Sequence, residues 1–303
     1  MYDIIVVGGG PAGLTAALYG RRAGKSVLLI EKNAFGGQIT WSPKVENFPS
    51  VLEISGLELA DRFVEQVLDK GAEIELDEVT ELSVEGGTKT VKTALGGEFQ
   101  SRSVILATGA KPRKLGVEGE DRFIGSGISF CAVCDGEFYK GRKVAVIGGG
   151  NSALQEAIYL SKLCEEVVLI HRREEFRGDK KLVENVKKQE NIKLCLSVKV
   201  VAFTGENAFE GIKISSKDGE ERIISVDGAF IAIGHEPDNG IFKEIAKVDE
   251  DGYFDSDEGC KTESQGIFVA GDCRKKSVRQ LTTAVADGAV AAVAACGYLD
   301  GIY

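Results

Sequence analysis

The residues most able to do chemistry in this sequence are two cysteines separated by two positions, Cys131 and Cys134, with Asp135 directly after them. Two thiols at this spacing can form a reversible disulfide within one turn, and an adjacent carboxylate can move protons during its exchange. A zinc half-site or two buried structural thiols would show the same spacing. The sequence has no second such pair and no cluster of His and Cys that would complete a four-ligand site, so we expect no metal.

Length and composition predict a soluble protein of roughly two domains. The 303 residues are 43% hydrophobic and 28% charged, and no apolar run is long enough to suggest a membrane span. A net charge of −10 argues against a general nucleic-acid binder. The first seven residues run straight into an apolar strand without the pattern of an export signal, so we expect a cytoplasmic protein.

A buried strand over residues 2–7 leads into a glycine-rich loop, a helix and a second strand over residues 26–30. This order is the setting that a dinucleotide-binding loop requires. Gly8 would make the tight turn, Gly10 would let the backbone approach a pyrophosphate, and Gly13 would let the helix pack closely on the strand. The helix start would face the phosphates, and an acid after the second strand would bind ribose hydroxyls. The predicted contacts are Gly8, Gly10, Pro11, Ala12, Gly13 and Glu31.

The same pattern returns 140 residues later, with strands over residues 143–147 and 166–170 and a helix over 153–163. Its loop contributes Gly148, Gly150, Asn151, Ser152 and Ala153. The position equivalent to the ribose-binding acid is His171, and Arg172, Arg173 and Arg177 follow it. Cationic groups here would bind a 2′-phosphate, which favours NADPH over NADH. A solvated basic face at a helix start would give the same run of charges.

The segments between and after these loops read as connecting structure. Residues 57–70 predict an amphipathic helix, residues 72–100 short antiparallel strands, and residues 192–233 a second meander. Near the end of the chain, a strand finishes in Gly271 and Asp272, and a long Ala-rich helix follows. An acid at the end of a sheet strand is placed to hold a ribityl hydroxyl.

In combination these motifs resemble the low-molecular-weight bacterial thioredoxin reductases over nearly the whole chain. The motifs are GGGPAG at 8–13, GGQI at 36–39, ENFP at 46–49, ATGA at 107–110, CAVCDG at 131–136, GGGNSA at 148–153, HRREEFR at 171–177, and AGD with RQ between 270 and 280. The resemblance implies an α/β fold of two Rossmann-like, three-layer dinucleotide-binding domains. An NADPH domain over residues 113–241 would carry the cysteine pair and interrupt an FAD domain over residues 1–112 and 242–303.

The resemblance also implies a role for each site residue. Cys134 would face the flavin, Cys131 would attack the partner protein, and Asp135 would act as the acid and base. Ser152 and the three arginines would lie around NADPH. Residues matching the flavin site are Gly36, Gly37, Gln38, Asn47, Gly109, Gly271, Asp272, Arg279 and Gln280.

The activity implied is electron transfer from NADPH through FAD and the Cys131/Cys134 disulfide to thioredoxin or a thioredoxin-like small protein. A homodimer is implied as well, with an NADPH domain that rotates on hinges near residues 112–118 and 237–245. Val133 stands where the family usually has Thr, which leaves the redox potential open.

Two kinds of alternative remain. A flavoprotein on the same scaffold could use another donor or acceptor, although ferredoxin-NADP reductases of this shape lack the cysteine pair. Dithiol oxidases and ferredoxin-driven relatives keep the pair but lose the cationic cluster that begins at His171. A protein of a different class could bind FAD and register redox state without turnover.

Overall fold

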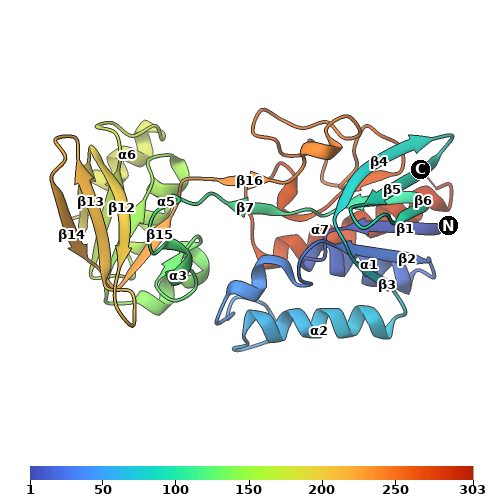
Figure 1. The fold of residues 1–303 in the computed structure, drawn as a ribbon, viewed down its shortest axis with the longest axis horizontal. Coiled ribbons are helices and arrows are strands. Elements are labelled where there is room, and N and C mark those ends of the chain that lie inside the picture. The colour runs from blue at the N-terminus through green and yellow to red at the C-terminus, as the bar shows by residue number, and fades with distance from the viewer. Residues whose placement is uncertain (303) are drawn as a thin grey trace. The chain divides into compact units, whose positions relative to one another are not determined.

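Residues Tyr2–Val7 form strand β1, and their apolar side chains are buried on both faces of a sheet, as expected for a parallel strand covered on both sides. We describe residues 1–302 from a computed structural model. The chain divides into two compact units, one made of Met1–Lys111 and Glu236–Tyr303 and the other of Pro112–His235. The chain passes from one unit to the other in two short strands, β7 (Ala110–Pro112) and β16 (His235–Pro237), which pair with each other (Figure 1).

The sheet of the first unit has the order β3-β2-β1-β6-β5-β4, and β17 also pairs with β6. Strands β1, β2, β3, β6 and β17 pair in parallel, whereas β4 and β5 extend the sheet antiparallel. The strands are β2 (Val27–Glu31), β3 (Glu73–Leu76), β4 (Val79–Glu85), β5 (Thr88–Thr93), β6 (Glu98–Leu106) and β17 (Ile267–Val269).

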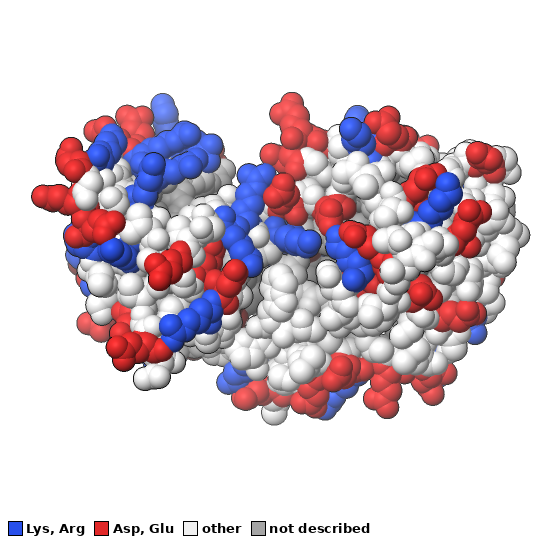
Figure 2. Space-filling model, viewed as in Figure 1, with Lys and Arg blue, Asp and Glu red and all other residues white. Residues whose placement is uncertain are grey.

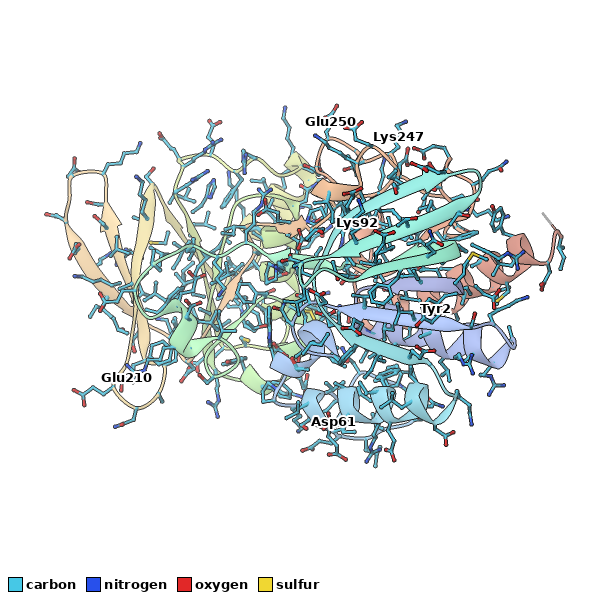
Figure 3. All side chains as sticks on the ribbon, turned by 45° about the vertical axis from the view of Figure 1, so that its right-hand side comes forward. Tyr2, Asp61, Lys92, Glu210, Lys247 and Glu250 are labelled. Carbon is cyan, nitrogen blue, oxygen red and sulfur yellow. A yellow bond between two sulfur atoms is a disulfide. The ribbon has the colours of Figure 1, made fainter. Side chains whose placement is uncertain are left out.

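Helices α1 (Pro11–Arg22), α2 (Gly56–Asp69) and α7 (Leu281–Leu299) cover one face of this sheet, where α1 packs along α7. Inward residues of β1 such as Ile4 lie in the core on this face, and Ile5 lies in the core on the other face with Phe242 and Phe254. Figure 3 shows Tyr2 on β1 and Asp61 on the outer side of α2. The unit is therefore built in three layers.

One helix among the described residues, α7, is long and apolar enough to cross a membrane by length and composition. One face of this helix has another explanation for its apolar residues, because Ala291, Ala292 and Ala295 are buried in the core beside α1. Gly288 lies so close to α1 that a Cβ there would sit 2.1 Å from the carbonyl oxygen of Ala12. Helix α7 is thus a core helix of the first unit.

The second unit repeats the layered design on its own parallel sheet, in the order β11-β10-β9-β15-β8 (Figure 1). Helices α5 and α6 cover one face, and an antiparallel sheet of β12, β13 and β14 covers the other. The strands are β8 (Ile128–Ser129), β9 (Lys143–Ile147), β10 (Glu166–His171), β11 (Ile192–Leu196), β12 (Val198–Thr204), β13 (Gly211–Ser216), β14 (Glu221–Ser225) and β15 (Gly228–Ile231). The helices are α3 (Glu120–Phe123), α4 (Ala132–Asp135), α5 (Asn151–Leu160) and α6 (Lys180–Lys187), and the 3₁₀ turns of the chain are η1 (Gly37–Trp41), η2 (Gly136–Tyr139), η3 (Gly240–Phe242) and η4 (Gly271–Cys273).

Two three-layer α/β units, the second interrupting the first, confirm the predicted fold class. Several local expectations were wrong. Strand β3 lies in the parallel sheet beside β2 and not in the antiparallel meander, and β11 and β15 likewise belong to the parallel sheet of the second unit. Helix α5 spans Asn151–Leu160, so it begins earlier and ends earlier than the predicted 153–163.

Candidate active site

The cysteine pair forms a disulfide at the surface of the second unit, with 5.3 Å between the two Cα atoms. Cys131 has an extended backbone and caps the one-turn helix α4, so its carbonyl oxygen and Sγ each accept from the Cys134 N–H at 3.2 Å. Cys134 and Val133 are exposed, and Ala132 is buried in the core beneath them. The turn is therefore anchored at Ala132, with Cys134 exposed and Cys131 half-buried.

Asp135 lies behind the disulfide in a protected position. The Ser129 hydroxyl donates to Asp135 Oδ2 at 2.5 Å, and the same oxygen of Ser129 accepts from the Cys131 N–H at 3.0 Å. Burial raises the pKa of the Asp135 carboxyl, and the hydrogen bond from Ser129 opposes this shift. Ser129 thus joins the acid to the redox turn, and no motif in the sequence points to it.

The first glycine loop has the tight geometry that its sequence predicts. Gly8 has φ +107°, and a Cβ there would lie 2.3 Å from the carbonyl oxygen of Ala107. A Cβ on Gly13 would lie 1.8 Å from the Gly8 carbonyl oxygen, so only glycine lets helix and strand approach this closely. No atom lies within 4 Å of a Cβ built on Gly10, and this open backbone could accommodate a pyrophosphate. Glu31 accepts from the Gly9 N–H at 2.6 Å, which fixes the acid at the loop.

Residues from distant parts of the first unit gather around this loop. A Cβ on Gly37 would lie 3.2 Å from the Gly10 Cα. Gln38 donates to the Ala110 carbonyl at 2.7 Å, and Gly109 beside it has φ +71° with open space around it.

At the start of α7, Asn47 donates to Gln280 at 3.4 Å, so the ENFP loop and the RQ motif meet. Arg279 donates to the Asp272 carbonyl at 3.3 Å, and its guanidinium lies 4.1 Å from the centre of the Tyr253 ring.

Asp272 provides the test of whether this site suits a flavin nucleotide. Its Oδ1 is buried and has no hydrogen-bond partner within the described protein, and burial raises the pKa of this carboxyl. A buried carboxylate oxygen normally has a donor. A hydroxyl of a bound ribityl chain would supply one, so the residues present fit FAD.

The second glycine loop has an equally close approach to its sheet. A Cβ on Gly148 would lie 2.3 Å from the Ala232 carbonyl oxygen, whereas a Cβ on Gly150 would meet nothing within 4 Å. Asn151 is held by Asp179 through two hydrogen bonds of 2.7 and 3.0 Å. Ser152 is exposed beside it, and Ala153 is buried.

His171 and the arginines that follow it are not equivalent in the structure. The His171 ring is buried, stacks on Phe176 with 5.4 Å between centroids, and has an Nε2 without a hydrogen-bond partner. Burial, and then the nearby arginines, lower the pKa of His171, whereas the hydrogen bond between His171 and the Glu175 backbone raises it. The balance is a pKa below the ordinary value of histidine. The cations at this loop are the three exposed residues Arg172, Arg173 and Arg177.

The backbone brings Arg177 to the loop, because its N–H donates to the Gly149 carbonyl at 2.8 Å. On the face drawn in Figure 2, Lys and Arg side chains gather near α6, the helix that follows this segment. On the first unit, acidic and basic side chains are interspersed.

The sequence did not lead us to predict one further ionisable group of the second unit. Glu156 on α5 has a buried Oε2 without a partner, and burial raises the pKa of this carboxyl to about 8. Nothing in a helical run of this composition distinguishes it from an exposed glutamate.

The described residues contain no group of three His, Cys, Asp or Glu side chains placed to hold a metal. Outside the disulfide, four cysteines are buried and Cys296 is half-buried.

Comparison with known proteins assigns the chain to a family. Residues 2–288 match the pyridine nucleotide-disulphide oxidoreductase family. The chain belongs to this family. The thioredoxin reductase of Listeria monocytogenes is 39% identical over 302 residues, which cover 99% of this chain and 94% of that protein. The bifunctional thioredoxin reductase/thioredoxin of Mycobacterium leprae is 40% identical over 97% of this chain, and the match spans 65% of its length.

A solved thioredoxin reductase from Streptococcus pyogenes has the same fold, with a TM-score of 0.95, 37% identity and 99% coverage of both chains. These matches confirm the resemblance that the motifs indicated. The cofactors of this oxidoreductase are FAD and NADPH.

Proposed function

We infer that the protein is an NADPH-dependent thioredoxin-disulfide reductase. The observation that carries this inference is the Cys131–Cys134 disulfide, which lies at the surface of the unit that holds the second nucleotide loop, with Cys134 exposed and a half-buried acid behind it. A protein partner can reach a disulfide at the surface, and a carboxyl beside it, whose pKa burial raises, can supply the proton that a departing thiolate needs.

We assign FAD to the first unit and NADPH to the second. In the first unit, the open backbone at Gly10 and the start of α1 would bind the pyrophosphate, and Asp272 would accept from the ribityl chain. In the second unit, the loop at Gly150 and the arginines after His171 would bind the phosphates of NADPH. When bound, FAD supplies the redox chemistry that links a two-electron hydride donor to the reduction of a disulfide.

The chemistry of the protein itself then follows from the redox turn. With Cys131 and Cys134 reduced, the Cys131 thiolate attacks one sulfur of the thioredoxin disulfide and forms a mixed disulfide, while the other thioredoxin sulfur leaves as a thiolate. Asp135, held by Ser129, gives that sulfur a proton. Cys134 then gives up its proton and attacks Cys131 Sγ, which restores the intramolecular disulfide and expels the second thioredoxin sulfur. That sulfur takes up the proton released by Cys134, so thioredoxin leaves with two thiols. The thioredoxin disulfide gains two electrons, and the cysteine pair loses them.

The protein partner in this proposal is thioredoxin or a thioredoxin-like small protein, and we propose that the enzyme acts as a homodimer in the cytoplasm. A net charge of −10 and the interspersed charges of the first unit support a protein without a nucleic-acid or membrane partner.

A steady-state assay tests the function directly. The purified flavoprotein is mixed with NADPH or NADH and with the small CxxC proteins of its host, and nucleotide oxidation is followed by absorbance. We expect rapid oxidation of NADPH that depends on a thioredoxin and is much slower with NADH. A protein that binds FAD but shows no thioredoxin-dependent turnover would instead be a redox sensor.

A further inference from the structure

A largely buried carboxylate on α7, Asp287, holds together three donors in the first unit. It accepts from the Gly271 N–H at 3.1 Å and from Lys276 Nζ at 2.9 Å, and Arg274 Nη1 lies 3.2 and 3.4 Å from its two oxygens. The side chains of Asp287, Arg274 and Lys276 are only 13%, 10% and 9% exposed. A single carboxylate thus pairs with two cations that water barely reaches, which leaves a net positive charge at this point.

Arg274 is fixed on its other sides as well. Its Nε donates to Ser256 Oγ at 2.9 Å, and its Nη2 donates to the Asp257 carbonyl at 2.8 Å. A guanidinium with this many partners has little freedom to move. The carboxylate of Asp287 is therefore held in one place, and so is the Gly271 N–H that donates to it.

The backbone that Asp287 holds is the turn that carries Asp272. Gly271 has φ +81° and packs against the first turn of α1, where its Cβ would lie 2.8 Å from the Ala12 Cβ. The residue after Asp287, Gly288, approaches the same turn of α1. The network thus locks the Gly271–Asp272 turn onto the helix that follows the first glycine loop.

Charge also links the network to the flavin site. Asp272 has a buried oxygen without a partner, and burial raises the pKa of its carboxyl while Lys276 and then Arg279 lower it. The group therefore contains three cations, Arg274, Lys276 and Arg279, and two carboxylates. It keeps an excess positive charge beside the loop where the anionic pyrophosphate would bind.

We propose that Asp287 is a positioning residue for FAD. It fixes the Gly271–Asp272 turn on α1, so that the Asp272 carboxylate is already oriented toward the ribityl chain when the nucleotide binds. The proposal rests on the assignment of FAD to the first unit, and it adds a residue that does not itself touch the cofactor.

The test measures FAD affinity and not turnover. Apoprotein of the full chain is prepared by removing the flavin and is titrated with FAD, and the dissociation constant is taken from the quenching of flavin fluorescence. We expect Asp287→Asn to raise this constant at least about tenfold. The visible circular dichroism of the bound flavin should weaken, because the ribityl chain is held less firmly. The KM for NADPH should stay unchanged.

Asp3→Asn is the matched control. Asp3 also accepts from a backbone N–H, that of Ser26 at 2.8 Å, and it forms an ion pair with Arg102. It lies at the start of β1, whereas the first glycine loop follows the other end of this strand. This variant should lower the melting temperature of the apoprotein and leave the dissociation constant of FAD unchanged.

The outcomes separate the two proposals. If Asp287→Asn lowers the melting temperature but binds FAD with the affinity and circular dichroism of the wild type, the positioning role is wrong and the network is only structural. If Asp287→Asn does not fold, Lys276→Met decides, because it removes one cation and leaves the Arg274–Asp287 pair. We expect it to weaken FAD binding severalfold, and unchanged affinity would overturn the proposal. A wild-type protein that binds no FAD would overturn the function proposed above instead.

Discussion

The Ser129 hydroxyl donates a 2.5 Å hydrogen bond to the Asp135 carboxyl and at the same time accepts the N–H of Cys131. Because this bond stabilises the ionised carboxylate, Ser129→Ala should raise the pKa of Asp135 further above its ordinary range. The limb of the pH profile of kcat/KM for thioredoxin that reports Asp135 should then move to higher pH. Asp135→Asn should remove that limb and slow disulfide exchange.

The control for this prediction is Ser126→Ala, since Ser126 lies just before β8 and bonds only loosely to the Arg122 carbonyl, at 3.5 Å. Flavin reduction by NADPH, followed in the absence of thioredoxin, should keep its wild-type pH profile in all three variants. An unshifted thioredoxin profile in Ser129→Ala would show that the hydroxyl does not control the acid.

The two cysteines of the redox turn should be needed for one half of the reaction only. Cys131→Ser and Cys134→Ser should lose thioredoxin reduction to background, because neither can form the disulfide. Reduction of the flavin by NADPH in a stopped-flow experiment should remain within about twofold of the wild type, since that step needs no thiol. Cys296→Ser, which changes a half-buried thiol, should retain full activity. Thioredoxin reduction by either redox-turn variant would refute the mechanism.

The exposed arginines after His171 should distinguish the two nicotinamide nucleotides. Replacing Arg172 and Arg173 by Ala removes charge-assisted bonds to the 2′-phosphate, and we expect KM for NADPH to rise roughly 100-fold. KM for NADH should change less than about threefold, because NADH has no such phosphate. Lys217→Ala, at the exposed turn between β13 and β14, serves as the control for loss of surface charge. Equal increases for both nucleotides would place the phosphate elsewhere.

Glu156 should make the protein less stable as pH rises. Its pKa is about 8 in the folded protein against 4.5 for the ordinary carboxyl, so the unfolded chain loses the proton first. Stability is therefore highest below about pH 4.5 as far as this group is concerned, falls between pH 4.5 and 8, and is level above that range. Glu156→Gln cannot ionise, and at pH 8 it should be more stable than the wild type by roughly 2 to 5 kcal/mol.

Denaturation of the flavin-loaded protein at a series of pH values between 5 and 9 measures this effect. Glu165→Gln, an exposed glutamate shortly after α5, should follow the wild-type curve. If the stability of Glu156→Gln declines with pH as steeply as that of the wild type, the decline does not come from Glu156. The Glu156 carboxyl is then ionised in the folded protein over this pH range.

Local features of this fold could be predicted from the sequence, whereas pairings between distant segments could not. The strand, glycine loop and helix around Gly8 are encoded within about thirty residues, and so is their repeat around Gly148. Strands β3 and β11 were mistaken for parts of meanders, because a short alternating strand has the same pattern beside a parallel or an antiparallel neighbour.

The same limit applies to the site. The equivalence of His171 with Glu31 in the repeat predicted a phosphate-facing group. The His171 ring instead lies over Gly149, and a Cβ on Gly149 would be 2.1 Å from this ring. The contact between Ser129 and Asp135 joins a strand to the end of the redox turn, and the contact between Asp287 and Gly271 joins a helix to a turn. Such contacts need the tertiary fold, and no spacing in the sequence announces them.

The insertion of one unit within the other has a consequence for synthesis on the ribosome. All of Pro112–His235 has been made before translation reaches β17 and α7, which complete the sheet and the core of the first unit. The nascent chain can therefore fold its inserted unit while the earlier one still exposes the edge of β6 and the apolar face of α1. That half-built sheet is open to aggregation until β17 and α7 emerge. Truncations before Ile267 should thus yield a folded insert attached to an unfolded, chaperone-dependent remainder.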